Sequence, residues 1–259
     1  MRVSALQLPI VIGDREKNTE TLRRMTAEAM KAQPDVLVLP ELWDIGFFPR
    51  PLADFTDAEG GAARALLSGL AAAYRVNIVG GSVAVSCGES VHNRCFVFDR
   101  GGTLVASYDK THLFSPAKED RHFAGGTSLA AFRLDDVPCA VIICYDLRFP
   151  ELARRLALGG AAVLFIPSAW PTARLAHWRV LTEARAVENQ MFVAAVNGSG
   201  AFANGMPLAG HSALLDPWGE RLAEAEEEEA VLTADFDLSV REKIKTSIDV
   251  FHDRREELY

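Results

Sequence analysis

The stretch AVIICYDLRFPELARRL, residues 140–156, places a cysteine between a buried strand and a helix. Four apolar residues (140–143) come directly before Cys144, and a short apolar run of this kind is typical of a strand inside a sheet. We expect a helix from Pro150 to Leu158, because proline is favoured in the first turn and two glycines follow the last residue. Two interpretations of Cys144 are open at this point, a core thiol or a nucleophile held at a strand end.

Outward from this stretch, strands and helices alternate in both halves of the chain, as in a layered α/β fold. In the first half we expect strands over residues 3–8, 35–40 and 76–85, helices over 18–31 and 59–74, and an antiparallel hairpin of 92–100 with 103–109. In the second half we expect a β segment over 132–144, strands over 161–169 and 191–200, and helices over 150–158 and 176–190. A strand-helix-strand unit ending VNIVGGS is matched by one ending FVAAVNGS, which indicates a duplication with two similar sheets face to face and helices outside.

The C-terminal part of the chain is richer in β structure. Residues 211–225 predict a strand that enters a turn at Asp216–Gly219, and we expect residues 230–237 to be its return partner. The acidic run EAEEEEA (224–230) is typical of a solvated connection. From about residue 238 the tail is too polar for a core of its own, so we expect it to contact a second subunit or to fray.

Composition bounds the kind of partner and the compartment. The chain has 259 residues, 49% hydrophobic and 24% charged, and no linker rich in Gly, Ser or Pro divides it, so we expect a single domain over residues 1–259. Its formal charge of -8 argues against nucleic acid and anionic membranes as partners. The four cysteines form no CxxC pair and no apolar run reaches the ~20 residues of a membrane helix, so we expect a cytoplasmic protein.

Several common catalytic and cofactor motifs are absent from the sequence. There is no GxSxG elbow of a serine hydrolase, no phosphate-binding GxxxxGKS or GxxxxGKT loop and no GxGxxG opening a helix. The six histidines include no HExxH pair, and Cys139 and Cys144 are not spaced like a zinc knuckle. The sequence therefore predicts neither a metal nor a cofactor.

Three polar residues stand just beyond expected strands, where layered α/β folds build their sites. Glu41 and Lys110 directly follow two of these strands, and Cys144 is the last residue of the β segment 132–144. Taken singly, each has an ordinary explanation, a glutamate at a helix start, a lysine on the surface and a cysteine in the core. Together they supply a proton acceptor, a cation and a nucleophile, which acyl transfer from an amide or nitrile requires.

These three residue types indicate a division of roles. A thiol with an unperturbed pKa near ~8.5 needs a base or a nearby positive charge to react near neutral pH. Glu41 can take the proton of Cys144 and later deliver it to the departing ammonia. Lys110 can orient that carboxylate, favour the thiolate and stabilise the oxygen of the tetrahedral intermediate, with the backbone N–H of Tyr145 as a second donor.

The motifs LPELW (39–43), YDKTHLF (108–114) and CYDLRFPEL (144–152), in this order, resemble the Glu, Lys and Cys motifs of the nitrilase superfamily of carbon-nitrogen hydrolases. The resemblance covers essentially the whole chain. It implies an α/β fold that is a four-layer αββα sandwich of two mixed sheets with internal pseudo-two-fold symmetry. It also implies a homodimer that acts on a small-molecule amide.

The resemblance further implies a role for each motif residue. Glu41 would be the general base, Lys110 the electrostatic stabiliser and Cys144 the nucleophile that forms an acyl-enzyme. The family carries a second glutamate that hydrogen-bonds the lysine, and Glu119 is the matching position, ahead of Asp120. The alternative is that Glu119 is an ordinary surface acid in a charged loop.

Within the superfamily, CYDLRFPE and AWPTARLAHW (169–178) look most like the omega-amidase branch, whose bacterial members hydrolyse the terminal amide of 2-oxoglutaramate. The resemblance implies a small dicarboxylate half-amide, such as 2-oxoglutaramate or succinamate, as the substrate. One alternative is an N-carbamoyl or general aliphatic amide hydrolase with the same three residues. The other is a non-catalytic binding module, which would have no need to keep them.

The distal carboxylate of such a substrate needs a cation. Arg174 is our candidate, because arginine binds carboxylates with a two-pronged fork, and an exposed arginine at a helix start is the alternative. We expect Arg148 to form a structural ion pair. We also expect Trp43, Phe114 and Trp170, which flank the motif residues, to wall the pocket, although each could equally belong to the core.

Overall fold

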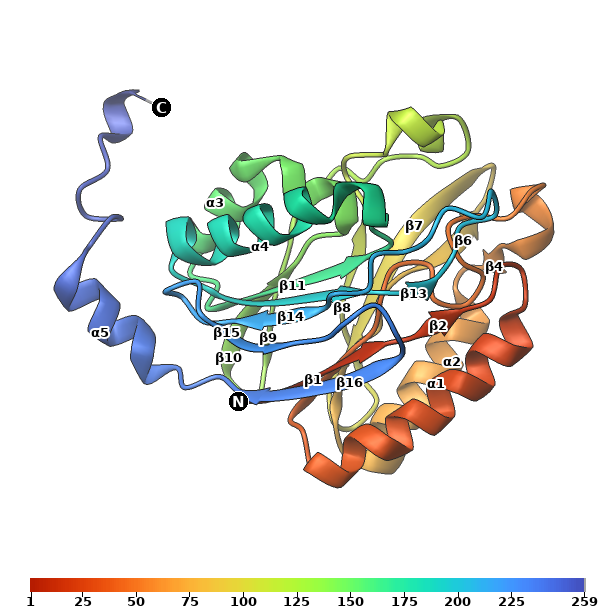
Figure 1. Cartoon of the computed structure of the whole chain (residues 1–259), viewed down its shortest axis with the longest axis horizontal. Coiled ribbons are helices and arrows are strands. Elements are labelled where there is room, and N and C mark those ends of the chain that lie inside the picture. Colours follow the sequence, from red (N-terminus) through yellow and green to blue (C-terminus); the bar gives the residue numbers. More distant parts are fainter. Residues whose placement is uncertain (259) are drawn as a thin grey trace.

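The computed structural model describes residues 1–258, which form two mixed β-sheets packed face to face (Figure 1). The first sheet has the order β16-β1-β3-β5-β7-β6-β4, with β8 paired to β7, and consists of β1 (Arg2–Gln7), β3 (Val36–Val38), β4 (Asp57–Ala58), β5 (Asn77–Val79), β6 (Val83–Cys87), β7 (Ser90–Phe98), β8 (Leu104–Asp109) and β16 (Ala230–Asp235). Strands β1, β3 and β5 are parallel, and antiparallel β16 and β7 flank them.

The second sheet repeats this plan. Its order is β15-β14-β12-β11-β10-β9, with β9 (Ala130–Leu134), β10 (Val137–Val141), β11 (Val163–Ser168), β12 (Phe192–Asn197), β14 (Ala213–Leu215) and β15 (Arg221–Glu224). Strands β10, β11 and β12 are parallel, and antiparallel β9 and β14 flank them. The expected internal duplication is therefore present, and the short pair β2 (Pro9–Ile10) and β13 (Ser199–Gly200) links segments that follow β1 and β12.

Helices form the outer layers of the sandwich (Figure 1). Helices α1 (Arg15–Ala29) and α2 (Gly61–Tyr74) cover the first sheet, and α3 (Pro150–Leu158) and α4 (Leu175–Asn189) cover the second. The other helices are α5 (Ser239–Ser247) and the short η1 (Met30–Ala32), η2 (Leu52–Phe55), η3 (Ser115–Ala117), η4 (Glu119–Arg121), η5 (Cys144–Arg148), η6 (Thr172–Arg174) and η7 (Glu256–Leu258). Over residues 1–258, none of the helices combines the length and the apolar character needed to cross a bilayer.

Local sequence signals explain where these helices start. Helix α1 begins after Asp14, whose side chain accepts a hydrogen bond from the backbone N–H of Lys17 (3.0 Å). Helix α3 begins with Pro150 and ends at Leu158, which confirms the bounds expected from the sequence. Together with β10 it holds the ends of the stretch that contains Cys144.

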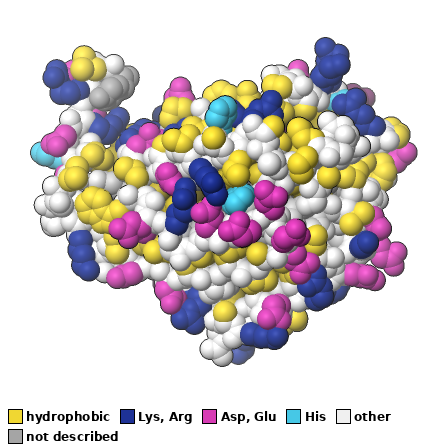
Figure 2. All heavy atoms as spheres, viewed as in Figure 1, with side chains coloured by type: hydrophobic (Ala, Val, Ile, Leu, Met, Phe, Trp, Pro, Cys, Tyr) yellow, Lys and Arg dark blue, Asp and Glu magenta, His cyan; other side chains and the backbone are white. Residues whose placement is uncertain are grey.

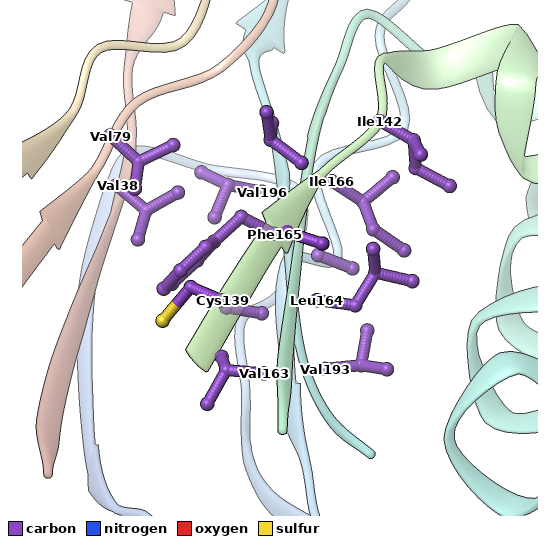
Figure 3. Close-up of a cluster of buried hydrophobic side chains, with 14 of the residues drawn as sticks. Val38, Val79, Cys139, Ile142, Val163, Leu164, Phe165, Ile166, Val193 and Val196 are labelled. Atoms are coloured by element: carbon purple, nitrogen blue, oxygen red, sulfur yellow. The ribbon is translucent and has the colours of Figure 1, made fainter. Parts of the chain in front are cut away.

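The main core fills the space between the two sheets. In Figure 3, Val38 and Val79 of the first sheet face Phe165 and Cys139 of the second, while Leu164 points to the opposite side, toward the helices. This alternation is what a strand buried on both faces requires. Burial raises the pKa of the Cys139 thiol to about 12, so Cys139 is an inert core residue.

One expected strand is divided in two by a turn. Residues 76–85 form β5 and β6 because the chain turns at Gly80–Gly81, and Gly81 has a φ of +63°. A Cβ at Gly81 would lie 2.1 Å from the carbonyl oxygen of Pro40. Only glycine therefore allows the end of β5 to approach the segment that carries Glu41.

The expectation for residues 230–237 was wrong. The return partner of β14 is β15, which follows directly after the turn at Asp216–Gly219. Strand β16 instead pairs along β1 at the edge of the first sheet, from Arg2 opposite Asp235 to Gln7 opposite Ala230. Alternation of apolar and polar residues indicates a strand, but it does not say which of several strands is the partner.

The tail beyond β16 leaves the body of the molecule and stands out at the upper left of Figures 1 and 2. Arg241 of α5 anchors its start, because its guanidinium donates to the carbonyl oxygens of Gln190 (2.8 Å) and Ala161 (3.2 Å). Farther along, Arg154 lies over the ring of Phe251. Contact of this tail with a second subunit stays a prediction.

The turn at Gly81 gives a test of how strand packing positions the site. We expect Gly81→Ala to destabilise the protein by more than about 3 kcal/mol for two reasons. The new Cβ would clash with the carbonyl oxygen of Pro40, and alanine is unfavourable at the positive φ of this position. Gly88→Ala is the control, since Gly88 also has a positive φ but has open space around its Cβ position, and it should cost only about 1 kcal/mol. Urea unfolding measures both, and equal losses would contradict the close approach to Pro40.

Candidate active site

Four side chains that are far apart in the sequence meet at strand ends on one side of the sandwich. Glu41 follows β3, Lys110 follows β8, Glu119 lies in η4 and Cys144 follows β10 as the first residue of η5. The two acids and the lysine have no exposed surface, and Cys144 is 7% exposed. A buried cation between two carboxylates is thus placed next to a thiol that solvent can reach.

Lys110 is the centre of this cluster. Its Nζ donates to Glu41 Oε1 (2.7 Å) and to Glu119 Oε2 (2.9 Å) and Oε1 (3.1 Å). The backbone of Phe114 donates to Glu119 Oε2 (2.6 Å), which fixes the second acid. Asp120, the less favoured choice from the sequence, is exposed and takes no part.

The position of Glu41 depends on the duplication of the fold. Its carboxylate Oε2 accepts a hydrogen bond from the backbone N–H of Ala169 (2.9 Å), and its own N–H donates to the carbonyl oxygen of Ser168 (3.3 Å). Ser168 and Ala169 lie at the end of β11, the strand of the second sheet that corresponds to β3 of the first. The two equivalent strand ends therefore hold each other, and they hold the carboxylate between them.

Cys144 lies at a strained turn. Its φ is +46°, a conformation that a non-glycine residue seldom adopts and that is often found at functional sites. The turn projects the thiol away from the core strand, so that Sγ lies 3.9 Å from the carbonyl oxygen of Ala169, the residue whose N–H holds the carboxylate of Glu41. The thiol also lines the pocket described below.

Asp146 holds this turn, and the sequence analysis did not assign it a role. Its fully buried carboxylate accepts from the backbone N–H groups of Ile143 (3.0 Å) and His112 (2.8 Å) and from the Tyr108 hydroxyl (2.8 Å). These bonds join the turn of Cys144 to the segment that carries Lys110. The signal in the sequence was an acidic residue two positions after the cysteine, directly beyond an apolar strand.

Asn93 is a second residue that the sequence analysis missed. It lies in β7 with no exposed surface, and its amide group donates to both Glu41 and Glu119. A polar residue inside an expected strand, shortly before its apolar part, was the available signal, but it does not say what the side chain contacts. The spatial cluster of charged groups supplies that information.

Burial and charge set the protonation states at this site. Burial raises the pKa of Cys144 well above its usual value, and the charge of Glu41 adds to this effect while Lys110 opposes it. Burial alone would lower the pKa of Lys110, but the charges of Glu119 and Glu41 outweigh it and raise the pKa. Burial also raises the pKa of Glu41, against the effect of Lys110. At neutral pH we therefore expect a thiol, not a thiolate, beside a charged lysine.

Next to Cys144 lies a pocket of about 280 Å3 with aromatic walls and basic groups. Phe114, Trp170 and the ring of Tyr145 line it, and so do Arg148 and Arg174. No acidic side chain is among its lining residues within the described chain. The pocket therefore presents an uncompensated positive charge to a small ligand.

Two expectations for aromatic and basic residues need correction. Trp43 does not wall the pocket, because its ring is buried in the core beneath the first sheet and its Nε1 donates to the carbonyl oxygen of Gly80 (3.0 Å). Arg148 has no acidic partner among residues 1–258, and it instead lies over the ring of Trp170 at 4.7 Å and reaches the ring nitrogen of His177 at 3.3 Å. Sequence position next to a motif did not distinguish these environments.

The described residues contain no group of three or more His, Cys, Asp or Glu side chains arranged to hold a metal ion.

Comparison with known proteins shows the family. Residues 2–246 match the carbon-nitrogen hydrolase family, and the chain belongs to it. The chain is similar to the 2-oxoglutaramate amidase of Bacillus subtilis, with 40% identity over 99% of this chain and 98% of that protein. It is also similar to the omega-amidase of Homo sapiens, with 32% identity over 100% of this chain and 96% of that protein.

A solved structure with the same fold is a mutant of the amidase from Nesterenkonia sp. AN1, in which acrylamide has added to the active-site cysteine. It has a TM-score of 0.87 and 27% identity, and the match covers 100% of this chain and 98% of that one. The expected αββα fold of the nitrilase superfamily is thereby confirmed. The chain is a hydrolase of carbon-nitrogen bonds.

The contrast between Cys144 and Cys139 gives a test of the site. We expect iodoacetamide to alkylate Cys144, which lines the pocket, and to leave Cys139 unmodified in the core. The rate should keep rising with pH above neutrality, because the pKa of Cys144 is raised and the reactive thiolate is scarce at pH 7. Mass spectrometry of the tryptic peptide 134–148 locates the label, and modification of Cys139 at a similar rate would contradict this account.

Proposed function

We propose that this member of the carbon-nitrogen hydrolase family hydrolyses the terminal amide of a small dicarboxylate half-amide, such as 2-oxoglutaramate or succinamate, to the dicarboxylate and ammonia. The observation that carries the proposal is the composition of one pocket, in which Cys144 lies together with the guanidinium groups of Arg148 and Arg174. The thiol suits the amide end of such a substrate, and the guanidinium groups suit its carboxylate end.

The reaction starts with transfer of the Cys144 proton to Glu41 as the sulfur attacks the amide carbon. Because the pKa of the thiol is raised, proton transfer accompanies the attack rather than preceding it. Glu41 then delivers this proton to the amide nitrogen, and the carbon-nitrogen bond breaks. Ammonia departs, and the acyl group remains on Cys144 as a thioester. Water attacks the thioester with Glu41 as the base, and the acid and the free thiol are regenerated.

Lys110 and Tyr145 are placed to stabilise the oxygen of the tetrahedral intermediates. Lys110 Nζ contacts one oxygen of Glu41 and both oxygens of Glu119. In this account one N–H is shared between the two oxygens of Glu119, and the third N–H of the ammonium group serves the substrate oxygen. The backbone N–H of Tyr145, next to the nucleophile, supplies a second donor. In this account Glu119 holds Lys110 in place and balances its charge.

The carboxylate end of the substrate is assigned to the two arginines. Arg174 lies over the ring of Phe114 (5.5 Å) and Arg148 over the ring of Trp170 (4.7 Å), so both are oriented by aromatic faces rather than by acids. Burial lowers the pKa of Arg148, and the charge of Arg174 lowers it further. Two neighbouring cations repel each other, and an anion bound between them relieves this repulsion.

The names of the relatives support this substrate class. A 2-oxoglutaramate amidase and an omega-amidase both match over nearly the full length of this chain. The main alternative is a general aliphatic or N-carbamoyl amide hydrolase, whose substrates the aromatic pocket walls would also accommodate.

We further propose that the protein is a homodimer. Two apolar side chains of α4, Val180 and Val187, are 57% and 49% exposed, and a second subunit would cover them. A monomeric mass in solution would contradict this proposal.

A substrate panel with ammonia detection tests the proposal. We expect turnover of 2-oxoglutaramate and succinamate with a higher kcat/KM than for butyramide or N-carbamoylglycine, and none by Cys144→Ala. Arg174→Ala should raise the KM of the half-amides about 10- to 100-fold, because a charged hydrogen-bonded pair with the substrate carboxylate is lost. It should leave the KM of butyramide, which has no carboxylate, almost unchanged. Arg179→Ala is the control, since Arg179 lies in the first turns of α4, close in sequence to Arg174, but pairs with Glu224 outside the pocket.

Release of ammonia from butyramide but from neither half-amide would contradict the substrate assignment. An equal rise in KM for butyramide and for the half-amides in Arg174→Ala would contradict the carboxylate site.

A further inference from the structure

Asn93 connects the two acids of the site with one amide group. Its Nδ2 lies 2.8 Å from Glu41 Oε1 and 3.1 Å from Glu119 Oε1, and the backbone carbonyl oxygen of Asn93 accepts a hydrogen bond from the backbone N–H of Lys110 (2.9 Å). Among residues 1–258, Lys110 and Asn93 are the only side chains that donate to both acids. All four side chains are fully buried.

The formal charges of this cluster do not sum to zero. Two carboxylates and one ammonium group leave one excess negative charge in a volume without solvent, so there is a strong tendency for one acid to take up a proton. An acid that is already protonated cannot accept the proton of Cys144. A neutral donor that serves both carboxylates lowers this tendency without adding a charge.

The orientation of the Asn93 amide agrees with two ionised acids. With the amide turned around, Oδ1 would face two carboxylate oxygens and repel them. In the observed orientation both N–H bonds are used, and Oδ1 has no hydrogen-bond partner within the described part of the chain. Leaving a buried acceptor unpaired is unfavourable, so the contacts of Nδ2 must outweigh that loss.

We propose that Asn93 is a positioning residue that keeps Glu41 ionised and directed at Cys144 by dividing its two amide hydrogens between Glu41 and Glu119. The proposal rests on the role of Glu41 as the base in the proposed function. It adds that the competence of this base depends on a neutral side chain of β7 as well as on Lys110.

The other charged groups near Asn93 do not compete for this role. On its own strand, His92 and Arg94 point to the opposite face of the sheet and contact Asp109 at 3.5 and 2.5 Å. The groups that face the Asn93 amide come from other elements, and they are Glu41, Lys110, Glu119 and, through Glu41, Cys144.

The test is the pH dependence of kcat/KM for the Asn93→Ala and Asn93→Asp variants. Without the amide hydrogens the ionised form of Glu41 is less stable, so the acid limb of the profile should move to higher pH by about one unit in Asn93→Ala. Asn93→Asp is isosteric, fills the same space if the alanine variant does not fold, and adds a third acid. It should move the limb at least as far.

Asn77 provides a matched control. It is also buried, its Nδ2 also donates to two oxygens, the backbone carbonyl of Asp35 (2.9 Å) and the carboxylate of Asp135 (2.7 Å), and its Oδ1 has no hydrogen-bond partner among the described residues. Asn77 is the first residue of β5 and lies beside Val36, the first residue of β3. The active site lies beyond the other end of β3, so Asn77 is remote from it. Asn77→Ala should lower the thermal stability and leave the acid limb where it is in the wild type.

An acid limb that stays in place in both Asn93 variants, with kcat reduced at every pH, would overturn the proposal and indicate a purely structural role. A limb that moves equally in Asn77→Ala would overturn it as well. The measurement uses whichever amide the wild type hydrolyses, or the pH dependence of Cys144 alkylation if it hydrolyses none. Failure of the substrate assignment appears in the wild type, and failure of this inference appears only in the variants.

Discussion

The buried pairing of one ammonium group with two carboxylates is the constraint on which the rest of the site depends. Lys110, Glu41 and Glu119 are excluded from solvent, so every polar atom among them needs a partner supplied by the fold. The partners come from both sheets, including the backbone of Ala169 at the end of β11. The duplicated strand order brings the C-terminal ends of β3 and β11 together, and the charged cluster lies where these two ends meet.

Cys144 is held by a second hydrogen-bond network, which shares elements with the charged cluster. The left-handed turn at Cys144 is unfavourable by itself, and the buried carboxylate of Asp146 compensates by accepting hydrogen bonds from Ile143 and His112. Because His112 follows Lys110 by two residues, the thiol and the ammonium group are positioned by one network. The segment that carries Lys110 thus supplies part of the hydrogen bonding that offsets the unfavourable backbone conformation at Cys144.

Much of the fold could be predicted because it depends on local patterns. Helix α3 has the expected bounds, and the repeated strand-helix-strand units were visible as two similar runs of apolar residues. The pairing of β16 with β1 could not be predicted, because it joins residues at opposite ends of the chain and any edge strand offers the same hydrogen-bonding groups. The division of residues 76–85 depends on a contact between Gly81 and Pro40 that local propensity does not encode.

The site shows the same limit. Glu41, Lys110 and Cys144 were recognisable because motifs surround them, whereas Asn93 and Asp146 act only through groups that tertiary structure brings to them. Trp43 stands two residues from Glu41, but its ring points into the core, since neighbouring side chains of an irregular segment follow no fixed period. Proximity in sequence therefore indicated the candidate reacting groups and not the residues that contact them.

The central claim is that an acyl group passes through a thioester on Cys144, and partitioning between two acceptors tests it most directly. With hydroxylamine present, succinamate and monomethyl succinate would form the same succinyl-enzyme after different leaving groups have departed. The account predicts one ratio of succinohydroxamate to succinate for both substrates. A ratio that depends on the leaving group would contradict a common thioester.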